Sequence, residues 1–302
     1  LAKPPALAIW EASTKPLAAG LPPGKKAVGN RYAVDFCVTV IEHDWGLAGE
    51  TVVLKGDGEP ACRALRKEVA AARRGKIFLE TSARGDHQAN GAAEQAVRTA
   101  RAHARTHLAA PAQKLGLSDL PADIPVLPWA VRHGAWCHHR FAVGADGRTA
   151  WERARGKPYK AVLAQLGERA LFLRPDHLRR GKMQGRFSRG VFLGRADRTN
   201  EVMIGVENQL VRTTKFLHLP ENEPFSAEAP EGLRGLLPWT AERAAGAGAP
   251  EVVFPSPLSS ADSGPAGPDT GTAEKRKHLA KRLIDKYGRT AGCQGCFPKR
   301  AP

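Results

Sequence analysis

The sequence predicts a mixed α/β chain, in which strands and helices alternate before a run of short strands. Two short apolar runs, residues 51–54 and 76–80, are each followed by a helical pattern, at 60–73 and 88–109. Between residues 166 and 219, short apolar runs alternate instead with turn residues, which is typical of a small β-barrel.

The composition indicates a polyanionic partner. The 302 residues suffice for one or two domains with proper cores, and they carry 46 Lys and Arg against 30 Asp and Glu, a net charge of +16. Nucleic acid is the common partner of such a chain, although an Arg- and Ala-rich composition also follows from a GC-rich gene. Five cysteines are too few for a disulfide framework.

A membrane partner and secretion are not expected. No apolar run approaches the roughly 20 residues that cross a bilayer, and no signal-peptide pattern opens the chain. The first residue is Leu, from which we expect a fragment of a longer product.

The elements of the first third can be justified in order. Residues 1–30 are rich in Pro, Ala, Gly and Lys and are predicted to be disordered. Residues 31–45 have apolar positions at helical spacing but a strand-like content of Val, Thr and Phe, which leaves helix and strand both open. The apolar run 51–54 predicts a buried strand. Pro60 suits the first turn of the helix that follows it.

The helix predicted at 88–109 carries a charged stripe. At about 100° per residue, Glu94 shares one narrow arc with three arginines. We expect a neighbouring face to pack inward. These two faces consist of Glu94, Arg98, Arg101 and Arg105, and of Ala93, Val97, Ala100, Ala104 and Leu108. A carboxylate followed by arginines suits a metal ligand beside a phosphate backbone, whereas the alternative is a solvated face with Glu–Arg pairs.

Further along, the pattern predicts a helix at 119–140 and a short one at 149–155. The first carries adjacent metal-ligand residue types, Cys137, His138 and His139, but no second ligand pair accompanies them, so we expect a half-buried helix. Short strands are predicted at 170–173, 190–194, 202–206 and 209–212.

The remaining chain divides into a linker and a tail. Residues 221–273 are dominated by Pro, Ala, Gly, Ser and Glu and are predicted to be a disordered linker. Residues 274–302 combine a basic helix with Cys293 and Cys296, half of a zinc-binding pattern whose second ligand pair is absent.

Asp57 and Glu94 carry the chemical hypothesis. Asp57 closes the strand candidate at 51–54, Glu94 lies at the head of the long helix, and residues 58–93 separate them. A carboxylate that ends a strand and another on the first turn of a helix can share divalent metal ions, as phosphoryl transfer on nucleic acid requires.

Three stretches resemble one protein family. They are Val53-Leu-Lys-Gly-Asp-Gly-Glu-Pro60, His87-Gln-Ala-Asn-Gly-Ala-Ala-Glu94 and Phe187-Ser-Arg-Gly-Val-Phe-Leu-Gly194. In this order they resemble the integrase region of a copia-type retrotransposon polyprotein. The resemblance covers residues 32–219 and implies a partial ribonuclease H-like integrase core at 31–160 and an SH3-like β-barrel at 161–220.

The resemblance also implies an activity. Asp57 and Glu94 would be catalytic residues and ligands of Mg²⁺ or Mn²⁺ in a polynucleotidyl transferase that joins element ends to target DNA. The residues expected to contact nucleic acid are His87, Asn90, Arg98, Arg101 and Arg105, although Asn90 also suits a helix cap. Such integrases work as multimers, in the nucleus or in a cytoplasmic particle.

One departure from the family pattern leaves the activity open. The family has an earlier Asp on an opening strand, but neither Asp35 nor Asp44 lies far enough before Asp57 to fit the intervening elements. Residues 31–45 are therefore interpreted as the family's first helix. The sheet would then lack its first strands and expose an edge and part of its core. The alternatives are an inactive relic that only binds nucleic acid and an unrelated basic interaction protein.

Overall fold

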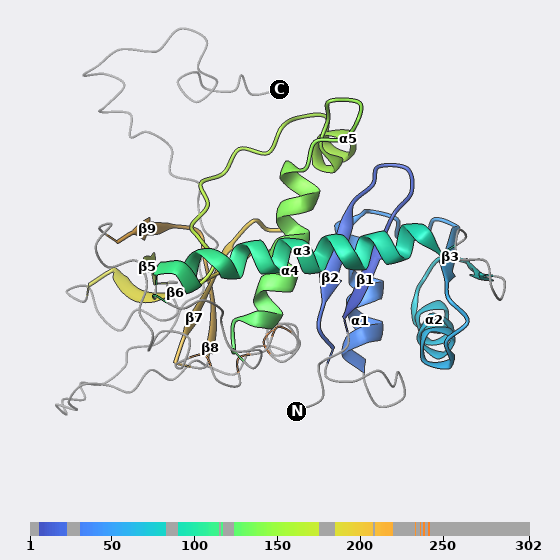
Figure 1. Ribbon diagram of the computed structural model, residues 1–302, viewed down its shortest axis with the longest axis horizontal. Helices are drawn as coiled ribbons and strands as arrows, with labels where there is room; N and C mark the ends of the chain where they lie inside the picture. The colour runs from blue at the N-terminus through green and yellow to red at the C-terminus, as the bar shows by residue number, and fades with distance from the viewer. Residues whose placement is uncertain are drawn as a thin grey trace, which may run out of the picture. The chain divides into compact units, whose positions relative to one another are not determined.

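A computed structural model describes residues 6–22, 31–82, 90–114, 116, 124–174, 185–207 and 209–219, and the single positions 233, 236, 238 and 241. All of them belong to one compact unit, residues 1–253. Within it helices and strands are mixed, in agreement with the predicted α/β class (Figure 1). The strands form two pairs and one five-stranded open sheet.

The first strand pair corrects the prediction that residues 1–30 are disordered. β1 (Leu7–Trp10) and β2 (Leu17–Gly20) form an antiparallel hairpin. Its turn is held by the Glu11 carboxylate, which accepts hydrogen bonds from the backbone N–H groups of Ser13 (2.6 Å) and Thr14 (2.8 Å). Every residue from 16 to 22 except the partly buried Ala18 is buried, so packing against the helices orders this stretch.

Residues 31–45 are helical, which settles the choice that the sequence left open. They form α1 (Arg31–Thr39), which continues into the π-helical turn η1 (Val40–Asp44). Asp35 is exposed on α1 and forms an ion pair with Arg31 on the preceding turn, at 3.2 Å. Asp35 therefore lies on a helix, as predicted, and not at the end of a strand.

The second strand pair is parallel. β3 (Val52–Gly56) is joined to β4 (Ile77–Thr81) through α2 (Pro60–Ala72), and the pairing register runs from Val52 opposite Ile77 to Gly56 opposite Thr81. Leu54 and Ile77 point from one face toward a small core under α1 and α2. The opposite face carries Val53 and Phe78, which are 56% and 50% exposed.

This exposed face agrees with the expectation that the sheet is incomplete. In the described residues β3 and β4 pair only with each other. Parallel sheets are normally covered on both faces, and their strands are correspondingly apolar on both. Val53 and Phe78 are apolar residues of a parallel sheet, but their side chains are exposed.

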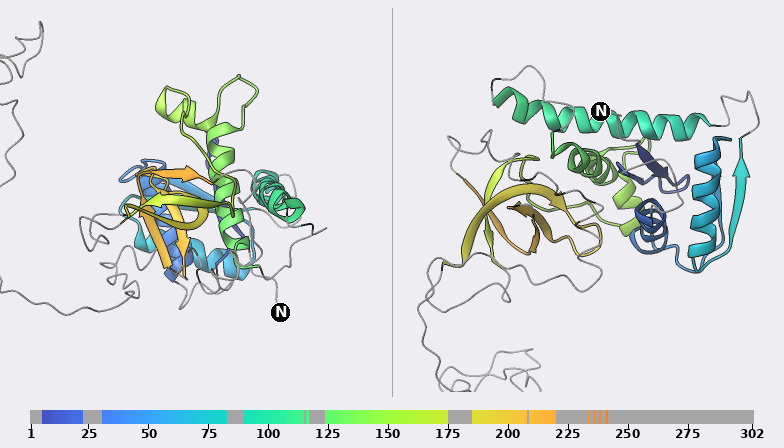
Figure 2. Two further views of the ribbon diagram at one scale, coloured as in Figure 1. Left: turned by 90° about the vertical axis from the view of Figure 1, so that its left-hand side faces the viewer. Right: turned by 90° about the horizontal axis from the view of Figure 1, so that it is seen from below.

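The helices that follow form the centre of the unit. α3 (Gly91–Lys114) extends beyond the predicted end at 109 and packs across α4 (Leu127–Phe141), which it crosses at a steep angle in Figures 1 and 2. Eleven of the fifteen residues of α4 are buried, so the prediction of a half-buried helix underestimated its burial. The short α5 (Ala150–Arg155) begins with a capping box between Thr149 and Glu152, as its sequence favours.

In the second half, strands form at the four predicted positions and at one more, and the described residues make an open sheet rather than the predicted closed barrel. β5 (Arg169–Leu173), β6 (Phe187–Arg195), β7 (Val202–Val206), β8 (Gln209–Thr213) and β9 (Phe216–His218) form an antiparallel sheet in the order β8-β7-β6-β5-β9. A register irregularity in β6 between Phe192 and Gly194 accompanies its strong curvature in Figure 2.

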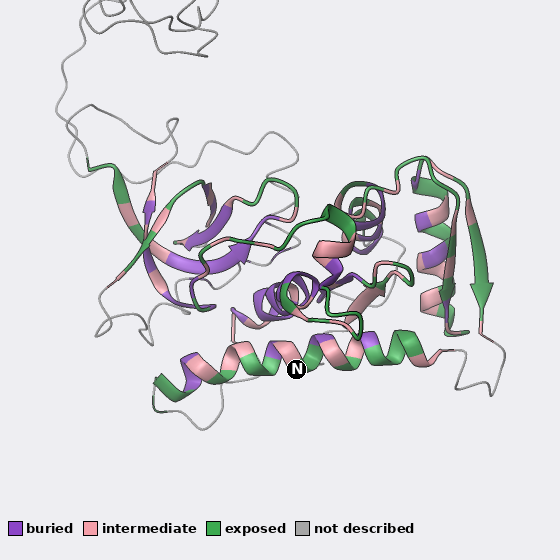
Figure 3. Cartoon of the chain, turned by 90° about the horizontal axis from the view of Figure 1, so that it is seen from above, coloured by how far each residue is buried: buried purple, intermediate pink, exposed green. Residues whose placement is uncertain are grey.

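One core runs through the hairpin, α3, α4 and this sheet, so no packing boundary follows residue 160 (Figure 3). The predicted linker also contributes to the core. Leu233, Leu236 and Ala241 are buried in it, and the indole N–H of Trp129 donates a hydrogen bond to the carbonyl of Leu236 at 2.8 Å. The prediction that 221–273 is a disordered linker is therefore wrong at these positions. The tail 274–302, including Cys293 and Cys296, lies outside the described residues.

In the described part of the chain, none of the helices combines the length and the apolar character that a membrane span requires.

The first prediction concerns the exposed sheet face. We expect Val53→Thr combined with Phe78→Thr to raise solubility and to change the free energy of unfolding by only about 0.5 kcal/mol, because surface substitutions lose little burial. Light scattering and urea unfolding measure the two effects. Val69→Ala is the control. Val69 is a fully buried residue of α2, and its substitution should lower the free energy of unfolding by about 2 kcal/mol. A large loss of stability in the double variant would mean that this face is covered.

The second prediction concerns the buried leucines after the sheet. Leu233 is 1% exposed, and a Cβ on Gly205 would lie 2.4 Å from its Cδ2, so the fit is close. We expect Leu233→Ala to cost about 2–4 kcal/mol in urea unfolding. Leu217→Ala removes the same atoms from a side chain that is 52% exposed and should cost about 0.5 kcal/mol or less. Equal effects of the two substitutions would restore the linker interpretation.

Candidate functional site

Asp57 lies directly beyond the carboxyl end of β3. Its carboxylate accepts a hydrogen bond from the backbone N–H of Glu59 at 3.1 Å, and Glu59 is the residue that caps α2. Pro60 at the start of α2 has no N–H to leave unpaired. The turn therefore holds a half-buried carboxylate where strand and helix meet, as the sequence predicted.

A buried arginine joins the strand ends at this point. Arg66 of α2 is 5% exposed, and its guanidinium donates hydrogen bonds to the carbonyls of Asp57 (2.8 Å) and Glu80 and to the Thr81 hydroxyl (3.2 Å). Glycine at position 56 makes room for it, since a Cβ there would lie 3.2 Å from Arg66 Nε. A metal ion on Asp57 would have to bind on a side away from this guanidinium, because the two cations repel.

Glu94 lies in the first turn of α3 and is exposed. Its backbone N–H donates to the carbonyl of Asn90 at 3.1 Å, which places Asn90 at the helix cap, the role that was one of its two alternatives. Figures 1 and 2 show α3 beginning beside the carboxyl end of β4, the edge at which β3 also ends. The elements that carry Asp57 and Glu94 thus lie toward the same end of the unit, which we call the carboxylate corner. His87 lies outside the described residues.

The donors at this corner fit one hard cation better than two. Mg²⁺ is commonly held by one or two carboxylates with phosphate oxygens completing its shell. A pair of ions requires a further ligand. In the part of the chain that the structure describes, no group of three His, Cys, Asp or Glu residues with closely spaced ligand atoms includes Asp57 or Glu94.

The arginine stripe of α3 is exposed, as predicted. Arg98, Arg101 and Arg105 are all exposed, and the far side of the helix carries the buried residues Ala96, Ala100 and Ala104. The predicted inward face is confirmed at Ala100 and Ala104, but the buried face as a whole is turned about the helix axis relative to the prediction. Ala93 is exposed, Val97 and Leu108 are only partly buried, and the buried face is turned toward positions 103 and 107.

This rotation brings a second set of chemical groups together between α3 and α4. The helices approach closely at Gly134, where a Cβ would lie 2.9 Å from the Cβ of His103 and 3.1 Å from the backbone N of Ala104. The imidazoles of His103 and His138 lie 3.1 Å apart, Nε2 to Nδ1.

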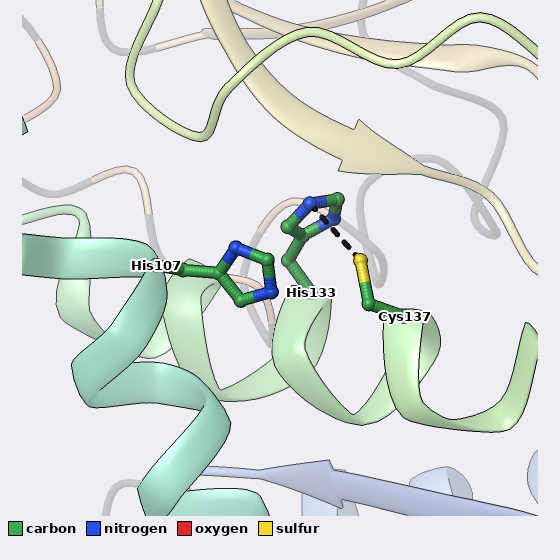
Figure 4. A group of neighbouring side chains, drawn as sticks. All are labelled: His107, His133 and Cys137. Carbon is green, nitrogen blue, oxygen red and sulfur yellow. Dashed lines mark hydrogen bonds between the residues drawn. The ribbon is translucent and has the colours of Figure 1, made fainter. Parts of the chain in front are cut away.

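One turn further along α3 is a tighter cluster. The rings of His107 and His133 are 4.9 Å apart between centroids, and Cys137 Sγ lies 3.4 Å from His133 Nε2 (Figure 4). One ligand atom from each of these three residues lies within 4.8 Å of the other two. We call these residues the His/Cys cluster.

Burial keeps these groups uncharged in the absence of a bound ion. Desolvation, with lesser contributions from His107, Arg132 and Arg140, lowers the pKa of His133 to about 3. Desolvation also raises the pKa of the Cys137 thiol to about 12, against a smaller opposing effect of Arg140. At neutral pH the His133 imidazole is therefore uncharged, and its unprotonated ring nitrogen has a lone pair that can bind a metal ion.

The three adjacent residues Cys137, His138 and His139 do not form one group in the structure. Cys137 belongs with His133, four residues earlier on the same helix face, whereas His138 contacts His103 and His139 packs near Trp151. The spacing of four residues, together with His103 and His107 at the same spacing on α3, was the signal in the sequence that indicated this pairing.

Comparison with known proteins identifies no relative. No protein-family model matches the chain, and the curated proteins contain no significant match to it.

Proposed function

We propose that this chain is a DNA-binding integrase region whose strand-transfer centre is incomplete within the described residues. The observation that carries the proposal is the order β3-α2-β4-α3, with Asp57 directly after the first strand and Glu94 on the first turn of the last helix. The integrase assignment rests on this order and on the motif resemblance.

DNA binding is the part of this function that the exposed side chains support best. Arg98, Arg101 and Arg105 are exposed on one side of α3, over roughly 10 Å at 1.5 Å per residue. Arginine forms bidentate hydrogen bonds to phosphate, and side chains spaced along one rigid helix can follow a nucleic-acid backbone. The net charge of +16 adds long-range attraction.

The carboxylates would contribute when a divalent cation is present. Asp57 and Glu94 would hold one Mg²⁺ or Mn²⁺, which when bound supplies Lewis-acid activation of a phosphodiester. The Glu59 N–H orients the Asp57 carboxylate, and the backbone bond from Glu94 to Asn90 fixes the helical turn from which the Glu94 side chain extends. Complete strand transfer needs a third carboxylate, so the alternative of an inactive, DNA-binding relic shares every described feature.

Element ends and target DNA are the proposed partners. A multimer acting in the nucleus or in a cytoplasmic particle follows from the same resemblance.

The third prediction tests DNA binding. We expect the affinity for duplex DNA to fall steeply with salt, and the combined substitutions Arg98→Gln, Arg101→Gln and Arg105→Gln to reduce the slope of log K against log [salt] by about 2–3, since each phosphate contact contributes about 0.9. Fluorescence anisotropy over a KCl series measures this slope.

The control for that experiment removes equal charge elsewhere. Arg63, Lys67 and Arg74 are exposed on α2 and directly after it, and their combined substitution by Gln should change the slope by less than about 1. A salt-independent affinity, or equal effects of the two triple variants, would contradict the proposed surface.

The fourth prediction tests the carboxylates. In EDTA, Glu94→Gln should strengthen DNA binding about two- to threefold, because a negative charge is removed beside the arginine stripe. Mn²⁺ should strengthen binding by the parent and leave the variant unchanged. We expect no joining of DNA ends by this chain alone. If strand transfer is detected and is lost in Asp57→Asn, the chain contains a complete centre, and its description as incomplete is wrong.

A further inference from the structure

The His/Cys cluster lies at the closest approach of two helices. Ala100 and Ala104 of α3 and Ala130 of α4 belong to the buried core, and Gly134 leaves no room for a side chain. Small residues at a helix interface let the backbones approach, so the larger side chains one turn away must meet. Those side chains are His107, His133 and Cys137, whose positions Figure 4 shows.

The separations within the cluster suit a tetrahedral ion. In such a site, Zn–N bonds of about 2.0 Å and a Zn–S bond of about 2.3 Å place nitrogen and sulfur about 3.5 Å apart. His133 Nε2 and Cys137 Sγ are already 3.4 Å apart. The remaining separations are at most 4.8 Å. His107 is half-buried, so its ring has room to turn toward the other two.

Among the described residues, the His133 imidazole has little hydrogen bonding. His133 is 3% exposed, and its Nδ1 has no hydrogen-bond partner among them. The ring packs against Trp136 and Phe192, and its only hydrogen-bond contact among these residues is through Nε2, toward a sulfur that is a weak donor. A buried imidazole and thiol held in this way form a poor hydrogen bond but a good pair of metal ligands.

We propose that His107, His133 and Cys137 bind one Zn²⁺ ion that joins α3 to α4. Two nitrogens and one sulfur select zinc, or Co²⁺ in its place, over the hard cations Mg²⁺ and Mn²⁺. The fourth position takes a water molecule, because His107 faces partly toward solvent and His103 is engaged by His138. Binding forms a Zn–S bond and releases the thiol proton to solvent.

The proposed ion has a structural role that is separate from DNA chemistry. It lies on the α4-facing side of α3, across the helix from the arginine stripe. By bridging the two helices it would hold the helix that carries Glu94 and the arginines against the main core. The site requires neither DNA nor the carboxylate corner, so it can be tested without either.

The fifth prediction is tested by cobalt titration of the full chain with Cys293→Ser and Cys296→Ser. These substitutions remove the only Cys-x-x-Cys pair in the sequence, which is a competing zinc ligand pair. We expect one equivalent of Co²⁺ to bind with tetrahedral d–d bands and a sulfur-to-cobalt charge-transfer band. Zn²⁺ should displace it. Elemental analysis after dialysis against Zn²⁺ should give one zinc per chain.

Three variants made in that background identify the ligands. Cys137→Ser should abolish the charge-transfer band, and His107→Asn, at a half-buried position, should weaken Co²⁺ binding at least tenfold. Cys62→Ser is the matched control, because Cys62 is a partly exposed thiol on α2 and should leave the titration unchanged. Circular dichroism checks that each variant is folded.

The outcomes separate the proposal from its alternatives. Zn²⁺ should raise the thermal midpoint of the background protein and leave that of Cys137→Ser unchanged. A stoichiometry near zero in the Cys293→Ser/Cys296→Ser background would overturn the proposal, as would a charge-transfer band that persists in Cys137→Ser. DNA binding by the background protein reports on the proposed function independently, so either idea can fail alone.

Discussion

The burial of α4 is the constraint on which the arrangement of the other elements depends. A helix with eleven of fifteen residues buried must be contacted from nearly every side, and here the hairpin, α3, α5 and β6 all pack on it. Its polar groups must also find partners inside the protein. Trp129 does so through the carbonyl of Leu236, which draws a segment far along the chain into the core. Without α4 the hairpin would keep only its contacts with α3 and with the core under α1, and Leu236 would lose its hydrogen bond to Trp129.

The charged residues of α4 show how this burial is compensated. Arg140 is 3% exposed; burial lowers its pKa, and the opposing effect of Asp197 favours the charged form. Its guanidinium lies 4.1 Å from the ring centroid of Trp136 and 3.3 Å from the Asp197 carboxylate. Since Asp197 follows β6, this contact ties the helix to the five-stranded sheet. Arg132, also of α4, forms a second ion pair with Asp197 at 3.3 Å. α4 therefore presents two cationic groups toward the sheet, and it presents one neutral cluster, His133 with Cys137, near His107 of α3.

Local sequence patterns predicted the elements that form by local rules. The strands at 52–56 and 202–206 and the helix at 60–72 each combine apolar periodicity with clear turn or cap residues. The hairpin was missed because its strands are four residues long and rich in Ala, so only tertiary packing distinguishes them from a loop. The buried Leu233 was missed for the same reason, since an isolated leucine in a Pro- and Gly-rich stretch has no periodicity. In the site, motif spacing pointed to Asp57 and Glu94, whose role stays a prediction. The sequence did not point to the His/Cys cluster, because it depends on the rotation of α3, which Gly134 and the alanines determine.

The exposed sheet face and the missing ligand of the proposed metal site would have a common physical origin. β3 has one edge that no strand of the described residues occupies, and its backbone groups there lack a ladder. Parallel strands end at the same edge of a sheet, so a strand added in parallel beside β3 would bring its own carboxyl end next to Asp57. A single acidic residue at that end would supply the missing ligand, and the added strand would widen the sheet enough for a covering element over Val53 and Phe78. Folding stability and metal-dependent chemistry would then be gained together.

The buried Arg66 meanwhile holds the two existing strand ends in register without that addition. These hydrogen bonds of Arg66 explain how a two-stranded parallel sheet can persist although the proposed metal site lacks a ligand.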